Sequence, residues 1–280
     1  MKTLLVLTDF SKTSEVAALY ACTLASQLQA KTIVLYHSYQ APIPVSDSLV
    51  WVNIDEALPQ SAMESLQEFE SRIKEKVPKG VVILHRTDSI RLTEVDRVAK
   101  DEEAGLIVMG TLSKTKFEEI VLGSNAIRVC ESSDYPVVLV PAHITIQPAG
   151  QIAFACNMKE IEKTIPETKL KMILDEFKLP VSVLNVDYED KHFTPDTPLN
   201  TMSLHNMLQH YDPAYYNINS ENLINAILEF AKKHPASIIL LISKRHNFME
   251  GLFYRSLTRQ LAYVSPLPLL ILRELTHKES

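Results

Sequence analysis

Short apolar runs alternate with longer amphipathic stretches along the chain, and this alternation limits the possible folds more than any other feature. Residues 4–7 are typical of a buried strand, and the stretch that follows, 13–28, has its apolar residues at helical spacing. The strands predicted in this way for the first half are 4–7, 32–37, 81–85, 106–109 and 137–140. Strands that alternate with helices predict parallel βαβ units, with helices on both faces of one sheet.

The helices expected in the first half lie between these strands. They cover residues 13–28, a stretch that opens at Ser61 with capping-box spacing to Glu64, residues 90–103 and residues 123–132. Cys22 and Cys130 occupy apolar positions of two of these helices, so we expect them to be packing residues.

The same pattern starts again after residues 142–150, a stretch with Pro148 that predicts a linker. Apolar runs at 152–156, 181–186, 237–243 and 267–272 match the first, second, fourth and fifth runs of the first half in order and spacing. Within 188–220, which is rich in His, Tyr and Pro, we expect a helix and a third strand near 215–218. The chain is therefore predicted to be a tandem repeat with one domain at 1–141, a linker at 142–150 and a second domain at 151–280. Each domain is expected to be α/β, with a doubly wound, mainly parallel, five-stranded Rossmann-like sheet.

Composition narrows the functional classes. A chain of 280 residues has room for two domains of roughly 150 residues each. Its net charge of −6 and the lack of a basic stripe argue against non-specific binding to nucleic acid or to an anionic membrane. No stretch approaches the ~18 apolar residues of a membrane span. The three cysteines never form C-x-x-C and are expected to be reduced thiols. Together these features predict a cytoplasmic protein.

The carboxyl ends of the strands are the expected ligand site, because open parallel sheets bind ligands there, where the strand order reverses. The chain has only 6 glycines, whereas roughly 20 would be expected at about 7%. Two of the 6 fall in the loop after the fourth strand, and the second opens a predicted helix, whose free N–H groups and dipole favour a phosphate. The candidate ligand-binding residues are Thr8, Asp9, Ser38, Gly110, Thr111, Ser113, Gly123, Ser124 and Asn125.

Three segments carry a family resemblance: Leu-Leu-Val-Leu-Thr-Asp-Phe-Ser at 4–11, Leu-Ile-Val-Met-Gly-Thr at 106–111, and the loop between Gly110 and Gly123. Through them the first half resembles a universal stress protein domain, and the whole chain resembles a tandem member of that family. The resemblance implies an adenine nucleotide alpha hydrolase-like fold with strand order 3-2-1-4-5. It also implies that the fifth strands, 137–140 and 269–272, pair in an intramolecular pseudo-dimer.

The resemblance implies ATP or a related adenine nucleotide as the ligand of the first domain. It gives Asp9 a contact with adenine or ribose, and it gives Gly110, Gly123, Ser124 and Asn125 the phosphates. An alternative for Asp9 is a helix-cap or turn residue, and an alternative for the two glycines is turn geometry alone.

Several positions depart from the family pattern. Ser113 stands where ATP-binding members have a second Gly, and Ser38 replaces the apolar residue that would lie against the adenine. These differences predict a reduced affinity. In the second half, Asn157 matches Asp9 and Arg255 matches Gly123, so that half is expected to be degenerate as a nucleotide site.

The leading hypothesis is a cytoplasmic stress-response protein whose first domain binds or senses ATP, without enzymatic activity; weak nucleotide hydrolysis stays open. Its partners would be the nucleotide and an unknown protein, and further homodimerisation also stays open. A metal site is not expected, because the 9 histidines never form His-x-x-x-His, and a P-loop is rejected for lack of its Gly-Lys-Ser/Thr. The alternative is a nucleotide-independent interaction scaffold in which both clefts have decayed.

Overall fold

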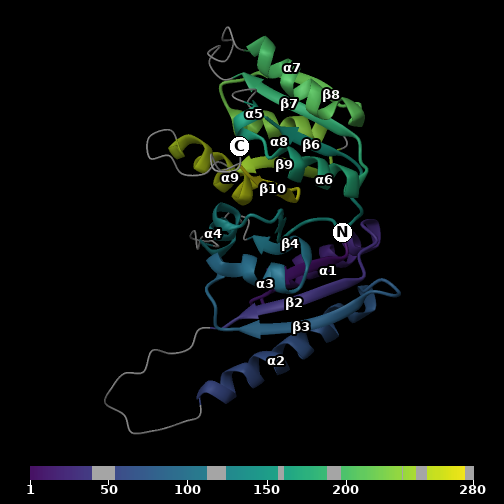
Figure 1. Ribbon diagram of the computed structural model, residues 1–280, viewed down its shortest axis with the longest axis vertical. Helices are drawn as coiled ribbons and strands as arrows, with labels where there is room; N and C mark the ends of the chain where they lie inside the picture. Colours follow the sequence, from purple (N-terminus) through teal and green to yellow (C-terminus); the bar gives the residue numbers. More distant parts are fainter. Residues whose placement is uncertain are drawn as a thin grey trace.

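The structure is a computed structural model that describes residues 1–39, 54–111, 124–156, 161–187, 197–234, 236–243 and 251–274. One ten-stranded sheet runs through the molecule, with the first half of the chain below and the second half above in Figure 1. The strands are β1 (Thr3–Leu7), β2 (Thr32–Ser38), β3 (Val82–Asp88), β4 (Ala104–Thr111), β5 (Val137–Pro141), β6 (Ile152–Ala155), β7 (Val181–Asp187), β8 (Ala214–Asn219), β9 (Ile238–Ser243) and β10 (Leu269–Arg273).

Helices cover both faces of this sheet. The α-helices are α1 (Lys12–Gln27), α2 (Ile54–Ile73), α3 (Val95–Asp101), α4 (Ser124–Ser132), α5 (Ile161–Thr164), α6 (Glu167–Phe177), α7 (Thr197–Leu208), α8 (Leu223–Lys233) and α9 (Gly251–Val264), and the 3-10 turns are η1 (Lys74–Lys76), η2 (Leu92–Glu94) and η3 (Gln209–Tyr211). The core on one face is shared with α1, α2 and α5–α7, and the core on the other face with α3, α4, α8 and α9. Among the described helices, none has both the length and the apolar character needed to cross a membrane.

The strand order confirms the predicted topology and the repeat. Along the sheet it is β3-β2-β1-β4-β5-β10-β9-β6-β7-β8, so each half has the order 3-2-1-4-5. The pairs within each half are parallel, as expected from βαβ units.

The two halves meet through their fifth strands, as the family resemblance implies. β5 and β10 pair antiparallel, with Leu269 opposite Leu139 and Leu270 opposite Val138. This pairing supplies the hydrogen bonds that β5 and β10 would leave open as edge strands. The two predicted five-stranded sheets are therefore joined into one ten-stranded sheet.

Alternation along the strands explains how both faces are buried. Leu4 and Val6 belong to the core beside α1, whereas Leu5 and Leu7 belong to the core beside α3 and α4. Successive side chains of a strand point to opposite faces, and a strand buried on both faces has the continuous apolar run that the sequence shows at 4–7.

Some element boundaries differ from those predicted. The helix expected to open at Ser61 begins at Ile54, so Ser61 lies inside α2 and its carbonyl accepts a hydrogen bond from Ser65. The helix expected over 90–103 is the turn η2 followed by the short helix α3. In the second half, a helix and a third strand do lie within 188–220, as α7 and β8; residues 188–196 are outside the described part.

Candidate functional site

A cavity of about 310 Å³ opens where β1, β2 and β4 end. The strand order reverses between β1 and β4, since β1 connects outward to β2 and β3 while β4 lies on its other side. This is the switch point at which open α/β sheets bind ligands. The cavity is lined by Leu7, Thr8, Asp9, Ser11, Thr13, Ser14, Tyr36, His37, Ser38, Leu92, Met109, Gly110, Asn125 and Ala126.

The turn from β1 to α1 forms one wall of the cavity and is held by short-range hydrogen bonds. The hydroxyl of Thr8 accepts from the N–H of Phe10 at 2.9 Å and donates to the hydroxyl of Ser14 at 3.0 Å. Ser11 is the N-cap of α1, because its side chain accepts from the N–H of Ser14 at 3.2 Å. Phe10 takes a left-handed conformation, with φ of 65°. These bonds fix the backbone on either side of Asp9.

Asp9 presents a carboxylate to the cavity. Partial burial raises its pKa, but hydrogen bonds from the side chain and backbone of Ser11 and from Ser14 outweigh this effect and leave the pKa below its ordinary value of 3.8. One of these bonds runs from the N–H of Ser11 to Asp9 Oδ1 at 3.1 Å. Asp9 is therefore both the turn residue of one hypothesis and an exposed, ionised acceptor that a ligand hydroxyl could reach.

His37 enters the same cavity from the end of β2. Its Nδ1 lies 2.8 Å from the carbonyl oxygen of Thr8. Because a carbonyl can only accept, Nδ1–H is the donor, and Nε2 is the acceptor of the neutral ring. The ring lies against Phe10, with centroids 4.4 Å apart, so its orientation is fixed from two sides.

Gly110 lies in β4 rather than in a loop, opposite Val140 of β5. A Cβ at Gly110 would come within 2.7 Å of the carbonyl oxygen of Thr13 and within 2.7 Å of its Cγ2. The glycine is thus required where the start of α1 crosses β4 closely. Turn geometry, which was one hypothesis for this residue, does not explain it.

The other candidate residues have different surroundings. The hydroxyl of Ser38 donates to the carbonyl of Ile90, so its polarity is satisfied within the protein. Asn125 lies in the first turn of α4 and lines the cavity, and Ser124 begins that helix. Thr111 is buried and does not line the cavity; its hydroxyl donates to the carbonyl of Ala262 in α9 at 3.3 Å.

The remaining candidates lie in the part of the chain that is not described. Ser113 and Gly123 are outside the described residues, as are Asn157 and the side chains of Ser124 and Arg255.

Sequence reasoning did not select several residues that line the cavity. Ser11, Ser14 and His37 were among them, although the N-cap position of Ser11 and the strand-end position of His37 were visible in the sequence. Leu92 could not have been found in this way, because η2 reaches the cavity through its contacts with α3 and α4.

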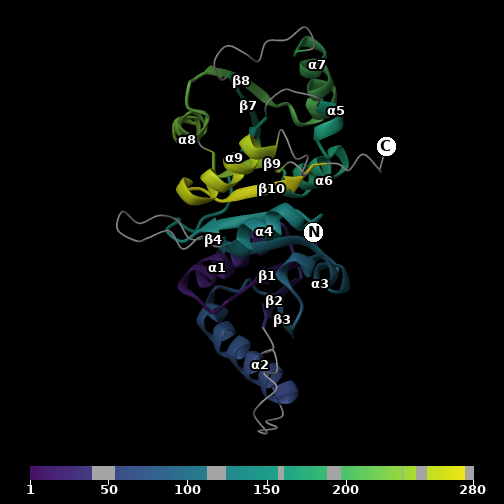
Figure 2. The same ribbon diagram turned by 90° about the vertical axis from the view of Figure 1, so that its left-hand side faces the viewer.

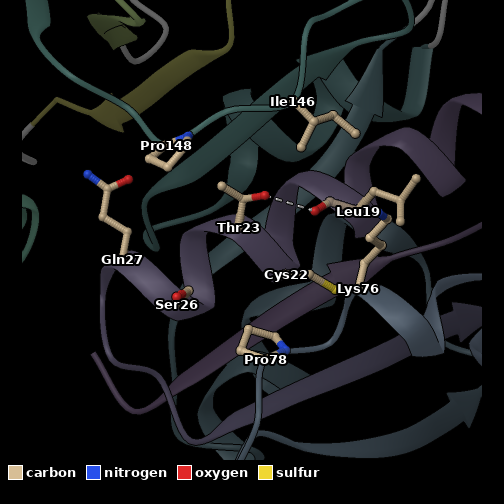
Figure 3. A pocket seen from close by; sticks show the side chains of 9 residues that line it. All are labelled: Leu19, Cys22, Thr23, Ser26, Gln27, Lys76, Pro78, Ile146 and Pro148. Atoms are coloured by element: carbon tan, nitrogen blue, oxygen red, sulfur yellow. Dashed lines mark hydrogen bonds between the residues drawn. The ribbon is translucent and has the colours of Figure 1, made fainter.

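A second cavity, of about 660 Å³, lies on the outer side of α1 between η1 and the segment with Ile146 and Pro148 (Figure 3). The hydroxyl of Thr23 donates a hydrogen bond to the carbonyl of Leu19. Burial raises the pKa of the Cys22 thiol to about 11. Lys76 is exposed at its edge. This cavity is larger, but among its lining residues we find neither a strand end nor a helix N-terminus. The smaller cavity therefore has the chemistry of a ligand site. The lining of the larger one is Leu19, Cys22, Thr23, Ser26, Gln27, Lys76, Pro78, Ile146 and Pro148.

The smaller cavity offers acceptors from β1 and β2 and a helix N-terminus from α4. Within the described residues there is no group of three or more His, Cys, Asp or Glu side chains that could hold a metal ion. Asp9 and His37 are the charged or titratable groups among the described residues that line it, apart from the phenol of Tyr36, which donates to Asp88 at 2.7 Å. The arrangement can accept hydrogen bonds from a hydroxylated ligand and can place an anionic group at α4.

The fold and the cavity define a doubly wound α/β protein with a candidate ligand site at the switch point of its first half. Residues 1–141, about half of the chain, match the model of the Universal stress protein family. The chain belongs to the universal stress protein family.

A curated relative and two solved structures give the same picture. Universal stress protein MJ0531 of Methanocaldococcus jannaschii is 31% identical over 144 residues, which are 50% of this chain and 81% of the relative. A universal stress protein structure from Archaeoglobus fulgidus aligns over 97% of this chain and 98% of its own, with a TM-score of 0.70 and 14% identity. A protein of unknown function from Pseudomonas aeruginosa, PA1789, aligns over 98% and 93%, with a TM-score of 0.60 and 13% identity. The two structures show that the fold extends over both halves.

Proposed function

We propose that this chain is a cytoplasmic stress-response protein whose first half binds an adenine nucleotide, ATP, in the cavity at the ends of β1, β2 and β4. The observation that carries the proposal is the position of the ionised Asp9 across the switch point from the start of α4. Asp9 would accept from the ribose hydroxyls, and the N-terminus of α4 with Asn125 would receive the phosphates.

An adenine base suits the acceptors of the cavity. With Nδ1–H bonded to Thr8, neutral His37 keeps an acceptor at Nε2. The exocyclic amine of adenine is a donor. A reduced affinity is part of the proposal, because Ser113 replaces a family glycine and no Lys or Arg occurs among the described residues that line the cavity.

We propose binding rather than turnover. A general base works best with a pKa near the operating pH, whereas hydrogen bonds from Ser11 and Ser14 hold the pKa of Asp9 below 3.8. Hydrolysis is therefore expected to be absent or weak, and release of inorganic phosphate from ATP over hours would measure it.

We propose that residues 1–141 and 151–280 are two domains of the same family joined by the linker 142–150, and that the second is degenerate as a nucleotide site. The scarcity of glycine in the second half supports the degeneracy of its site, because Gly150 and Gly251 are the glycines of the second half and its linker. An unidentified protein partner would recognise the nucleotide-bound form of the first half.

A second candidate function is a nucleotide-independent scaffold, and Gly110 favours it. Close packing against Thr13 is a sufficient reason for this glycine, so its presence does not require a phosphate. Under this alternative the cavity would be a remnant.

The deciding experiment is a search for bound nucleotide followed by a titration. Freshly purified protein is denatured and the supernatant is assayed for released nucleotide, and ATP is then titrated by calorimetry. We expect binding that Asp9→Asn weakens about 10-fold or more, because a hydrogen bond to a charged group is worth about 1.5–3 kcal/mol. Asp212→Asn is the matched control, since Asp212 lies in the second half and Asn tolerates its left-handed φ of 45°. If no nucleotide is released and no binding is detected at millimolar ATP, the nucleotide-independent scaffold is the function.

A further inference from the structure

β4 and α4 both contribute residues to the cavity, and the second half of the chain contacts each of these two elements directly. We infer that the second half positions β4 and α4, through Thr111 and Arg273, and thereby sets the affinity of the cavity for its ligand. This inference rests on the proposed function for its ligand, ATP. Thr111 and Arg273 are positioning residues in this account, because neither lines the cavity.

Thr111 ties the end of β4 to α9. Met109 and Gly110 line the cavity, and Thr111 is the next residue along β4. Its side chain is 5% exposed, and its hydroxyl donates to the carbonyl of Ala262 at 3.3 Å. A buried hydroxyl needs a partner, and here the partner belongs to the second half. The strand end that forms the cavity wall is therefore held against α9.

Arg273 holds the opposite end of α4. Asn125 and Ala126 line the cavity at the start of this helix, and Ser132 is its last residue. The guanidinium of Arg273, at the end of β10, donates to the carbonyl of Ser132 and lies 3.4 Å from a carboxylate oxygen of Asp134. A cation at the C-terminus of a helix satisfies a free carbonyl and interacts favourably with the helix dipole.

The same end of α4 is also fixed from within the first half. Asp96 of α3 accepts from the N–H of Asp134 at 2.7 Å and from the hydroxyl of Ser133. The buried side of α4, with Val129 and Cys130, lies in the core that contains Leu261 of α9. Figure 2 shows α4 beside β10, where the two halves join.

Geometry makes this anchoring relevant to the cavity. α4 has nine residues, so it is roughly 12 Å long between its first and last Cα atoms at 1.5 Å per residue. A short rigid helix that pivots at Ser132 moves Asn125 at its other end. Linkage then requires that a ligand held by Asn125 also stabilises the contacts of Arg273.

The test uses the full chain and two measurements. Hydrogen exchange without ligand reports the protection of α4 and of the end of β4, and calorimetry with ATP reports affinity. We expect Arg273→Met to raise exchange in α4, and Thr111→Val to raise it at the end of β4. Each is expected to lower the affinity for ATP about 5-fold or more, the lower end of the range for coupled sites.

Control variants separate positioning from loss of stability. Gln27→Met removes two hydrogen bonds between α1 and the linker, from Gln27 to the carbonyl of Ala149 at 2.9 Å and from the N–H of Ala149 at 3.0 Å. This variant should leave α4 exchange and ATP affinity unchanged. Thr111→Ser keeps the hydroxyl and should show wild-type exchange at the end of β4 and wild-type affinity for ATP. Arg273→Lys keeps the cation and should show α4 exchange and ATP affinity between those of wild type and Arg273→Met.

The outcomes distinguish the two proposals. Unchanged exchange in α4 and β4 in the Arg273 and Thr111 variants overturns the positioning, and so does an unchanged affinity for ATP. If the wild-type chain does not bind ATP, the proposed function fails. The exchange measurement then decides the positioning by itself. Faster exchange in Thr111→Val but not in Thr111→Ser supports the positioning. Exchange at the wild-type rate in Thr111→Val and Arg273→Met overturns it.

Discussion

Gly110→Ala gives the sharpest prediction, because the structure shows what the added methyl group would meet. Its Cβ would lie 2.7 Å from Cγ2 and from the carbonyl oxygen of Thr13, and 2.9 Å from the carbonyl carbon. Two of these three atoms belong to the backbone of α1, whose start is fixed by the N-cap Ser11. A flexible side chain could turn away, but this backbone cannot.

The cost can be estimated from the overlap. Increasing a separation of 2.7 Å to an ordinary contact of 3.4 Å moves α1 from β4 by roughly 0.7 Å. Overpacking of this kind costs about 1–3 kcal/mol. β4 lies inside the sheet between β1 and β5, so we expect about 2–3 kcal/mol. At about 2–4 °C per kcal/mol, the melting temperature of Gly110→Ala should fall by about 4–12 °C.

Two other glycines supply matched controls. At Gly150 an added Cβ would lie 3.4 Å from the hydroxyl of Ser237, an ordinary contact, so Gly150→Ala should stay within about 0.5 kcal/mol of wild type. At Gly105 the nearest atom is 2.9 Å away, but it belongs to the flexible side chain of Met1. Gly105→Ala should therefore fall between the other two.

Calorimetric melting and urea unfolding of the three variants check this order. Because the two halves share one sheet, both transitions should be followed with a second probe before a single free energy is assigned. If Gly110→Ala melts within 1–2 °C of Gly150→Ala, an interval of about 1 kcal/mol or less, the packing account of Gly110 is wrong.

Three further predictions concern the core, pH dependence and the thiols. Leu270→Ala removes a fully buried side chain from β10 and should cost about 2–5 kcal/mol; a loss no larger than that of Leu199→Ala, which is 66% exposed, would contradict it. Burial and a hydrogen bond to Asp175 raise the pKa of Tyr211 to about 12. Because the fold favours the neutral phenol, the contribution of Tyr211 to stability is fully present below pH 10 and is lost as the pH rises through about 12. Tyr211→Phe should therefore reduce the fall in melting temperature over that pH range. An unchanged slope of melting temperature against pH would refute this prediction. An aromatic disulfide reagent at pH 8 should label the half-exposed Cys156 before Cys22, whose pKa burial raises to about 11; labelling of Cys22 first would contradict this, and the unfolded chain, with all 3 thiols accessible, is the control.

The inner strands were predictable because they are buried on both faces, whereas β3 and β8, at the two edges of the sheet, are partly exposed. A run such as 106–109 is apolar without interruption, and the structure extends it only to Ala104–Thr111. Helix starts were less predictable. Ser61 and Glu64 match a capping box, but α2 already begins at Ile54, and a four-residue pattern does not reveal that the preceding residues are helical.

The candidate site was predictable in part. The position at the strand ends followed from the topology, and five of the nine candidates line the cavity: Thr8, Asp9, Ser38, Gly110 and Asn125. His37 was overlooked because its importance depends on the carbonyl of Thr8 and the ring of Phe10, which are brought to it by pairing of β1 with β2. Thr111 was selected as a ligand residue, whereas its hydroxyl bonds to Ala262, more than 150 residues further along the chain.

The sequence by itself determined the order of strands and helices, the repeat of that order in two halves and the location of the candidate site, because periodicity and turn residues are local properties. The tertiary structure decided why Gly110 is a glycine, why Ser38 can be polar, and which half holds Thr111. Those answers depend on contacts between residues that are far apart in the chain. A residue's type cannot show which backbone atom lies 2.7 Å away or which carbonyl accepts its hydrogen bond.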